Sequence, residues 1–364
     1  MSSVVFKPAA HNISPLLSLR TFCFALYLSF KPMSASASCQ NYFLCNTGGG
    51  GLGDQLEHYI YCLYCAKLLN ASVVLNGFHG GPAIHQGTSE YRDAATLLGI
   101  VSIVNTSYVE HLNFRSLELS FPEILSLHNG VYNGSLNAAC NIVYISDIYS
   151  CPDVRSRWCD FLPTYDSLKA VLWKLRHSQA RQKCVDRGLG FNFSSVVNIV
   201  WHVRVGDICL HCNDLNYYSS LYSRLLTASS TLSTSHHLVF ESQGKLEFLE
   251  QHEMFKWATF NYNSTLMETI CRFLTSDVLI TSGSSFPPFV AAFAPPWTPI
   301  VLEERRKEAP VGSSMAHHFF NEEEAVLLDD GEPLLSVDEF SAVFESVLNE
   351  KLFRQRAATD RENR

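Results

Sequence analysis

The chain has 364 residues, of which 47% are hydrophobic and 17% charged, and its formal net charge is −8. This composition is typical of a folded protein of one large or two ordinary domains. The excess of acidic residues argues against a nucleic-acid partner, and the basic residues of EKLFRQRAATDRENR alternate with acids, as in a solvated tail.

The first 37 residues differ from the rest, because no Asp or Glu precedes Asp54. Basic residues, the apolar run TFCFALYLSF and an A-x-A site at 35–37 predict a secretory signal peptide over residues 1–37. The upstream run ISPLLSL could extend it into a signal anchor, and an acid-free, Ser-rich segment also fits an organellar transit peptide. No later segment resembles a membrane span, so we expect membrane contact only through this segment.

Cysteines and glycosylation sequons favour the secretory pathway. Twelve cysteines are many for a cytosolic chain, and the eleven after residue 37 leave at least one thiol unpaired. We therefore expect the lumen of the endoplasmic reticulum or Golgi. Cys62-x-x-Cys65 and Cys209-x-x-Cys212 could hold zinc, but core thiols or separate disulfides are favoured for Cys62 and Cys65. N-x-[ST] sequons begin at Asn70, Asn105, Asn133, Asn192 and Asn263.

Residues 38–188 are expected to form the first domain. The domain opens with a predicted βαβ unit, which indicates a parallel sheet. This unit consists of a short strand in YFLC, the loop TGGGGLGDQ, an amphipathic helix in DQLEHYIYCLYCAKLLN and a strand in ASVVL. One further helix is predicted in YDSLKAVLWKLRHSQARQKCVDRGLG. It should end at Gly188 or Gly190, where the two domains join.

The glycine loop satisfies G-x-G-x-x-G but does not predict a dinucleotide site. Such a site needs an acid near the end of the next strand, and that strand ends in Asn76 and Gly77. A P-loop needs Gly-Lys-Ser/Thr, and this loop has Gly53-Asp54-Gln55. Glycines that only permit a tight turn remain an alternative.

Residues 189–335 predict a second α/β domain. Strands are expected in SSVVNIVWHV and HHLVFESQ, a helix in YYSSLYSRLLTAS, and a helix, strand and helix in STLMETICRFLTSDVLITSGSSFPPFVAAFA. An irregular connection follows. Residues 336–364 are expected to form an amphipathic helix and a polar tail.

The strand of NIVWHVRVGD delivers His202, Arg204 and Asp207 to its carboxyl end, where open parallel sheets bind ligands. Arg is the side chain that grips phosphate oxygens with two donors. A structural salt bridge between Arg204 and Asp207 is an equal alternative. Ser284 and Ser285 precede a helix that begins near Phe286, so its N–H groups and hydroxyls suit an anion, although Ser285 could simply cap the helix.

HVRVGD resembles the H-x-R-x-G-D motif of the fucosyltransferase superfamily, which comprises α1,2-, α1,6- and protein O-fucosyltransferases. Two further blocks resemble those of protein O-fucosyltransferases. Their opening block is similar to YFLCNTGGGGLGDQLEHYIYCLYCAKLLNASVVL, and their third block is similar to LTSDVLITSGSSFPPFV. The three blocks lie in the family's order across residues 42–290.

The resemblance implies a GT-B-like α/β fold of two Rossmann-like domains that face a cleft. It also implies inverting transfer of fucose from GDP-fucose to a glycan or protein hydroxyl, without a metal or other cofactor. Arg204 would stabilise the departing GDP, and Ser284, Ser285 and Phe286 would line the phosphate and fucose pocket. His202 would contact the nucleotide, and Asp207 would hold Arg204 or contact the donor.

The resemblance further implies that Glu268 approaches the guanine and that Gly51 and Gly53 form a bare loop on the acceptor side. Asp54 stands where the protein O-fucosyltransferase loop usually has Asn, and it could be the general base or a helix N-cap. The family's α1,2- and α1,6-enzymes often carry Arg-Arg where this chain has Arg204-Val205. A transferase for another nucleotide sugar and a non-catalytic binding relative are the alternatives.

Overall fold

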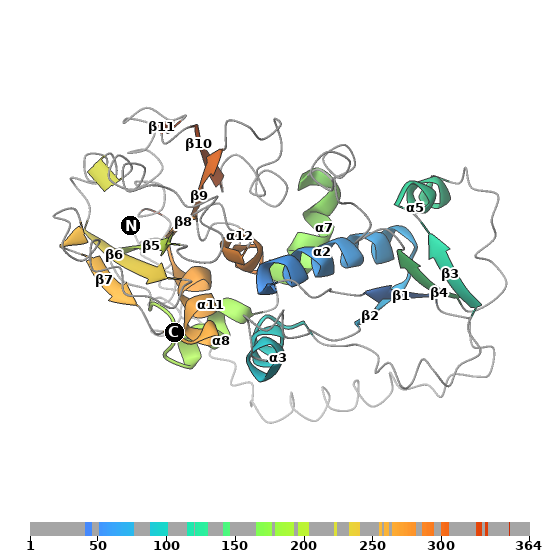
Figure 1. Cartoon of the computed structure of the whole chain (residues 1–364), viewed down its shortest axis with the longest axis horizontal. Coiled ribbons are helices and arrows are strands. Elements are labelled where there is room, and N and C mark those ends of the chain that lie inside the picture. Colours follow the sequence, from blue (N-terminus) through green and yellow to red (C-terminus); the bar gives the residue numbers. More distant parts are fainter. Residues whose placement is uncertain are drawn as a thin grey trace, which may run out of the picture. The chain divides into compact units, whose positions relative to one another are not determined.

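The computed structural model is an α/β protein with two β-sheets, in which every strand pair but one is parallel (Figure 1). The predicted α/β class is therefore confirmed. The structure describes residues 41–45, 51–75, 88–100, 115–119, 121–129, 141–145, 165–176, 179–192, 196–203, 222–223, 233–240, 255–256, 258–261, 264–281, 286–294, 300–305, 325–329, 332–333 and 349.

The smaller sheet has four parallel strands in the order β2-β1-β4-β3. These are β1 (Tyr42–Cys45), β2 (Ser72–Leu75), β3 (Arg115–Leu119) and β4 (Asn141–Ile145). Helix α2 (Leu52–Leu68) connects β1 to β2, which confirms the predicted βαβ unit. The chain here also forms α3 (Thr88–Leu97), α5 (Phe121–His128), α7 (Tyr165–Arg176) and α8 (Ala180–Asp186).

The larger sheet has seven strands in the order β11-β10-β9-β8-β5-β6-β7, and only the β10–β11 pair is antiparallel. Its strands are β5 (Val197–Val203), β6 (Thr234–Phe240), β7 (Ala258–Asn261), β8 (Val278–Ile280), β9 (Ile300–Arg305), β10 (Ala325–Asp329) and β11 (Glu332–Pro333). Every residue of β5 is buried, as expected for a central strand of a parallel sheet. Two helices follow within this part, α11 (Leu266–Thr275) and α12 (Phe286–Ala291).

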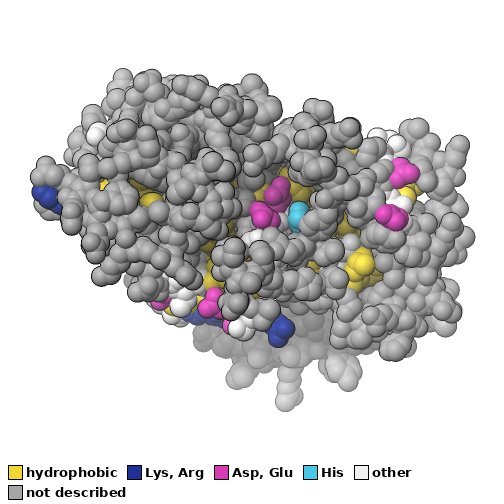
Figure 2. All heavy atoms as spheres, viewed as in Figure 1, with side chains coloured by type: hydrophobic (Ala, Val, Ile, Leu, Met, Phe, Trp, Pro, Cys, Tyr) yellow, Lys and Arg dark blue, Asp and Glu magenta, His cyan; other side chains and the backbone are white. Residues whose placement is uncertain are grey.

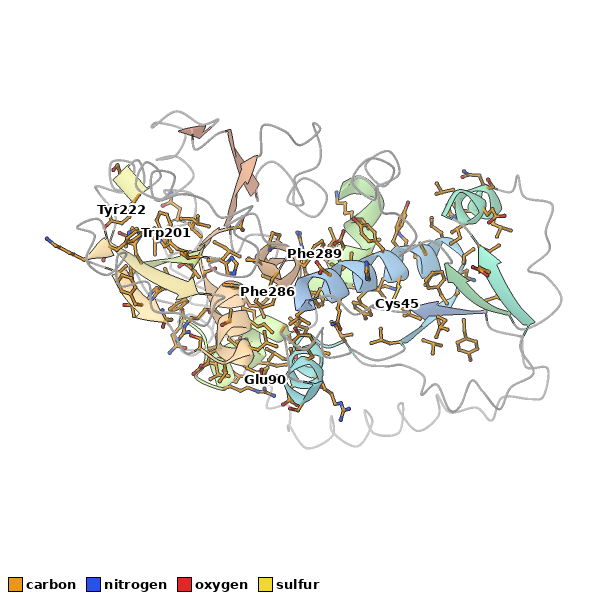
Figure 3. The ribbon with its side chains drawn as sticks, in the orientation of Figure 1. Cys45, Glu90, Trp201, Tyr222, Phe286 and Phe289 are labelled. Atoms are coloured by element: carbon orange, nitrogen blue, oxygen red, sulfur yellow. A yellow bond between two sulfur atoms is a disulfide. The ribbon has the colours of Figure 1, made fainter. Side chains whose placement is uncertain are left out.

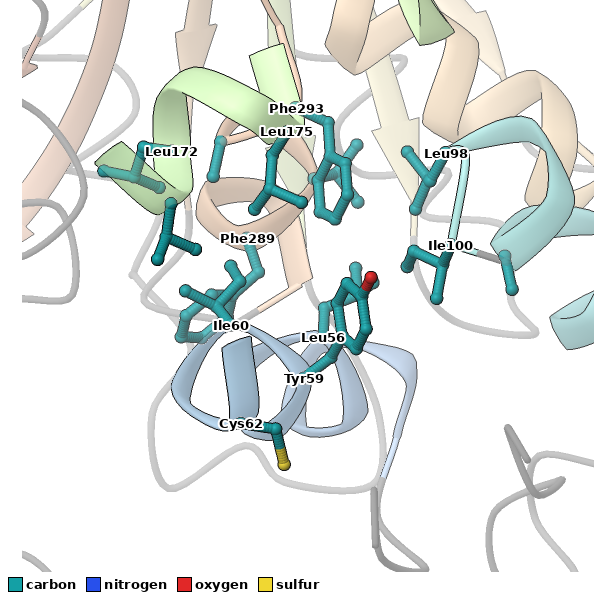
Figure 4. Close-up of a cluster of buried hydrophobic side chains, with 14 of the residues drawn as sticks. Leu56, Tyr59, Ile60, Cys62, Leu98, Ile100, Leu172, Leu175, Phe289 and Phe293 are labelled. Carbon is teal, nitrogen blue, oxygen red and sulfur yellow. The ribbon is translucent and has the colours of Figure 1, made fainter. Parts of the chain in front are cut away.

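Helix α2 is apolar on more than one side because it packs on its own sheet and also on α7 and α12. Figure 4 shows Leu56, Tyr59 and Ile60 of α2 facing Phe289 and Phe293, which lie on and just after α12. All five side chains are buried. One hydrophobic cluster therefore contains both the helix that follows the glycine loop and the helix that follows Ser284 and Ser285.

The helix expected between Tyr165 and Gly188 is instead two helices. Helix α7 ends at Arg176, and α8 begins at Ala180, directly after Gln179, whose φ of 59° lies in the left-handed region. A left-handed residue does not continue a right-handed helix, so α8 begins anew after Gln179. The second helix ends as expected, at Gly188 with φ 66°, because glycine adopts this conformation without strain.

The irregular connection expected after α12 contains strands β9, β10 and β11, so this expectation was wrong. The runs IVLEER and AVLLD are short and stand beside charged residues, and pairing with the strand alongside, rather than their own pattern, defines them as strands. Most of the helices expected in 217–229 and 336–353 falls outside the described residues.

Two disulfides cross-link the described part of the chain. Cys45 of β1 pairs with Cys62 of α2, and Cys184 of α8 pairs with Cys271 of α11. The second bond links residues on either side of the expected domain boundary at residue 188. Cys65 is a buried thiol, and burial raises its pKa to about 12, so it is a structural thiol rather than a reactive one.

The disulfide of Cys62 excludes the zinc alternative for the Cys62-x-x-Cys65 pair, whereas Cys209 and Cys212 lie outside the described residues. In the described part of the chain, no three His, Cys, Asp or Glu residues form a group suited to a metal ion. Over the same residues, no helix combines the length and apolarity needed to cross a bilayer.

Candidate functional site

The candidate site lies where β5 and β8 end, at the topological switch point of the larger sheet. The chain runs from β5 outward to β6 and β7, returns to β8 on the other side of β5, and continues outward to β9 and β10. Connections from β5 and β8 therefore leave in opposite directions. In open α/β sheets, ligands bind outside the carboxyl ends of the strands at such a point.

Two of the predicted site residues are joined through a third aromatic ring. His202 of β5 is fully buried, and its ring meets Phe273 of α11 edge-on, with centroids 5.6 Å apart. Phe273 in turn packs on Phe286, the first residue of α12, with ring centroids 5.4 Å apart. Figure 3 labels Phe286. The sequence did not single out Phe273, because an apolar residue at helical spacing indicates only a core position.

Four predicted site residues lie outside the described residues. Arg204 and Asp207 follow β5 along the chain, and Ser284 and Ser285 precede α12. Their assigned roles stay predictions. The structure describes Val203, which ends β5 directly before Arg204, and Thr281 and Phe286, which lie before and after the two serines.

Glu268, predicted to approach a guanine, has a local structural partner. It is the third residue of α11, and its carboxylate accepts hydrogen bonds from the backbone N–H and the hydroxyl of Thr265, at 2.8 and 3.1 Å. Thr265 Oγ1 accepts from the Glu268 N–H at 3.2 Å, which completes a capping box. Hydrogen bonds from Thr265 lower the pKa of Glu268. A guanine would have to share this carboxylate with the cap.

The residues predicted to lie on the acceptor side are at the start of α2, after β1. Gly51 is the N-cap of α2 with an extended backbone, so the alternative that Asp54 caps this helix was wrong. Gly53 is buried in the first helical turn, and Asp54 follows it as an exposed carboxyl. Among the described residues, no heavy atom lies within 4 Å of the place where a Cβ on Gly51 would stand.

A second carboxyl on α2 was not predicted. Glu57 lies one turn after Asp54 and His58 lies beside it, so the three share one helix face. Figure 2 shows acidic side chains next to a histidine over α2. Glu57 is half-buried, and burial of its carboxyl together with repulsion from Asp54 raises the pKa of Glu57 to about 8. A carboxyl that holds its proton near neutral pH is suited to acid–base chemistry.

Gly51→Ala is expected to lower stability by no more than about 1 kcal/mol, the cost of a poorer N-cap, because among the described residues the new Cβ meets no atom and the backbone is extended. If a substrate approaches this loop, the same change lowers turnover about tenfold or more through steric exclusion. Thermal unfolding measures the effect on stability, and a turnover assay measures the effect on substrate binding. Gly190→Ala is the matched control, because its Cβ would stand 2.6 Å from Thr275 Cγ2 and should lower the unfolding temperature. Full turnover by Gly51→Ala would contradict a role for the loop in binding.

The pH dependence of stability is expected to be governed on its alkaline side by Glu57. Its folded pKa lies above its unfolded value of 4.5, so the folded state binds more protons and stability falls as pH rises toward 8. His236 acts oppositely: burial and then repulsion from His237 lower its pKa to about 4 from 6.5, so stability rises with pH between these values.

Urea unfolding of the wild type and of Glu57→Gln, each at pH 6.5 and pH 8, isolates the Glu57 effect, because the opposite contribution of His236 and His237 is common to both proteins. The wild type should lose at most about 2 kcal/mol across this window, with screening of the half-buried group taken into account. Glu57→Gln should lose far less, and Glu90→Gln, which changes an exposed carboxyl on α3, should follow the wild type (Figure 3). An equal change in stability for the wild type and Glu57→Gln between these pH values would contradict the raised pKa of Glu57.

Comparison with protein families and with curated proteins found no match. Among solved structures, the chain is similar to the NodZ α-1,6-fucosyltransferase soaked with GDP-fucose, with 12% identity, a TM-score of 0.39, and coverage of 70% of this chain and 93% of that one. It is also similar to the Escherichia coli heptosyltransferase WaaC with ADP-2-deoxy-2-fluoro heptose, with 10% identity, a TM-score of 0.38, and coverage of 85% and 99%.

A third similar structure is the Escherichia coli ADP-heptose LPS heptosyltransferase II, with 9% identity, a TM-score of 0.38, and coverage of 86% of this chain and 99% of that chain. TM-scores below 0.5 do not identify a function. The function of this chain is therefore argued from its own residues.

Proposed function

We propose that this chain is a metal-independent glycosyltransferase of GT-B type that transfers fucose from GDP-fucose to a hydroxyl of a glycan or protein. The observation that carries the proposal is the switch point of the seven-stranded sheet. There, buried His202 is the last residue but one of β5, the strand that leads into Arg204, and Phe286 begins the helix that follows Ser284 and Ser285. The H-x-R-x-G-D resemblance assigns a sugar-nucleotide diphosphate to the same edge.

In this proposal, Arg204 stabilises the negative charge that develops on the leaving GDP. An arginine fork fits phosphate oxygens with two parallel hydrogen bonds, and donors positioned where charge develops accelerate the reaction. The acceptor hydroxyl attacks fucose C1 from the opposite face, so the configuration inverts. The hydroxyl proton passes to Asp54, an exposed carboxyl at the start of α2.

We also propose that the protein works in the lumen of the secretory pathway. The Cys45–Cys62 and Cys184–Cys271 disulfides support an oxidising compartment. Of the five sequon asparagines, the described residues include Asn70 and Asn192, and both are exposed to solvent and accessible to glycosylation. Mass spectrometry of the secreted protein, before and after removal of N-glycans, tests this assignment.

Binding of nucleotides tests the proposed donor. GDP should raise the unfolding temperature of the full chain, because a ligand that binds only the folded state stabilises it, and UDP should raise it much less. Stabilisation by UDP without stabilisation by GDP would show that the donor is another nucleotide sugar. Stabilisation by neither nucleotide would contradict the proposal.

A further inference from the structure

A buried threonine stands beside His202 at the edge of the switch point. Strands β5 and β8 are parallel, and their last paired residues are Trp201 and Ile280. Extending this register by one residue, past the end of β8, sets Thr281 opposite His202. Because opposed residues of parallel strands project to the same face of a sheet, both side chains leave on the face where His202 meets Phe273.

The hydroxyl of Thr281 is buried without a hydrogen bond. Thr281 is 0% exposed, and in the described part of the chain its Oγ1 has no hydrogen-bond partner. Buried hydroxyls are ordinarily bonded, and leaving one unpaired destabilises a fold. A nearby threonine shows the ordinary case: the Thr275 hydroxyl donates to the Cys271 carbonyl at 2.6 Å and accepts from the Phe191 N–H at 2.9 Å.

The position and the burial of Thr281 together indicate that its hydroxyl binds a ligand. Thr281 directly follows β8, and a little further along the chain are Ser284 and Ser285, to which the proposed function assigns the donor. An unsatisfied polar group at a functional edge is stabilised when a ligand supplies its partner. A hydroxyl can donate one hydrogen bond to an anionic oxygen, and such bonds are stronger than neutral ones.

We propose that Thr281 is a donor-binding residue whose hydroxyl donates a hydrogen bond to an oxygen of the nucleoside diphosphate, next to His202. The inference rests on the proposed function. It adds a residue that the sequence pattern did not mark, because Thr281 reads simply as the end of an apolar strand. It also explains why a hydroxyl occupies a buried position that valine would fill equally well.

Thr281→Val tests the proposal, because it removes the hydroxyl and keeps the shape. Without nucleotide, the variant should unfold at the wild-type temperature or about 2–4 °C above it, since an unpaired buried hydroxyl is removed. With GDP as the probe, its Kd measured by calorimetry should rise about tenfold or more. Thr281→Ser, which keeps the hydroxyl, should bind GDP nearly as the wild type does.

Thr275→Val is the matched control, because it removes a satisfied hydroxyl: it should lower the unfolding temperature and leave the GDP affinity unchanged. Wild-type GDP affinity in Thr281→Val would overturn the inference and leave the proposed function standing. The inference would also be overturned if Thr281→Val lost as much stability as Thr275→Val, because that loss would show that Thr281 Oγ1 is hydrogen-bonded within the protein. Absence of GDP binding by the wild type would overturn the proposed function and this inference with it.

Discussion

Arg204→Ala is expected to lower kcat/KM for GDP-fucose by about 10²–10³-fold, the cost of removing one positioned donor from a site where charge develops. The measurement is hydrolysis of GDP-fucose, with water as the acceptor, which requires no knowledge of the natural acceptor. Arg204→Lys should recover only part of the activity, because an ammonium group carries the charge but lacks the planar fork.

The matched control is Arg187→Ala, which removes an exposed arginine at the end of α8 and should leave turnover unchanged. Thermal unfolding must show that Arg204→Ala remains folded. The alternative of a structural Arg204–Asp207 salt bridge makes a different prediction: the alanine variant would lose stability, and its turnover per folded molecule would stay near that of the wild type.

Replacing both cysteines of the Cys184–Cys271 disulfide with alanine is expected to cost about 4–5 kcal/mol of unfolding free energy. The bond spans 87 residues of sequence, and cross-linking a loop of that length restricts the unfolded chain by about this amount. The Cys45–Cys62 bond spans 17 residues, so its removal should cost less, about 3 kcal/mol. Urea unfolding of the two double variants measures both values and their order.

Cys65→Ala is the control, because it removes a buried thiol that belongs to neither disulfide. It should cost only the packing of one sulfur, about 1 kcal/mol. If the Cys184–Cys271 double variant lost no more than Cys65→Ala, the bond would not form in the folded protein. A reductant should destabilise the wild type more than the Cys184–Cys271 double variant, because the variant already lacks that bond.

The sequence predicted the elements whose patterns are local. The βαβ unit around α2, strand β5 and helix α12 all stand where apolar periodicity and start signals placed them. The break at Gln179 had no such signal, because Gln is an unusual residue for the left-handed conformation. Strands β9 and β10 depend on pairing with β8, a contact between distant segments that no single-sequence pattern encodes.

The candidate site was predictable only where a motif marks it. His202 and Phe286 lie in blocks that resemble a family, and the structure joins them through Phe273, which only the packing of α11 reveals. Glu57 and Thr281 had no signal, because what distinguishes them is a raised pKa in one case and an unpaired buried hydroxyl in the other. Both properties arise from the tertiary surroundings rather than from spacing.

Release of nucleotide from sugar donors by the wild-type chain tests the account most directly. The full-length protein would be incubated separately with GDP-fucose and with UDP-linked hexoses, without added metal, and the freed nucleotide measured. We predict turnover of GDP-fucose and none of the UDP sugars. Turnover of a UDP sugar alone would contradict the donor assignment, and GDP binding without any turnover would show a binding protein instead of a transferase.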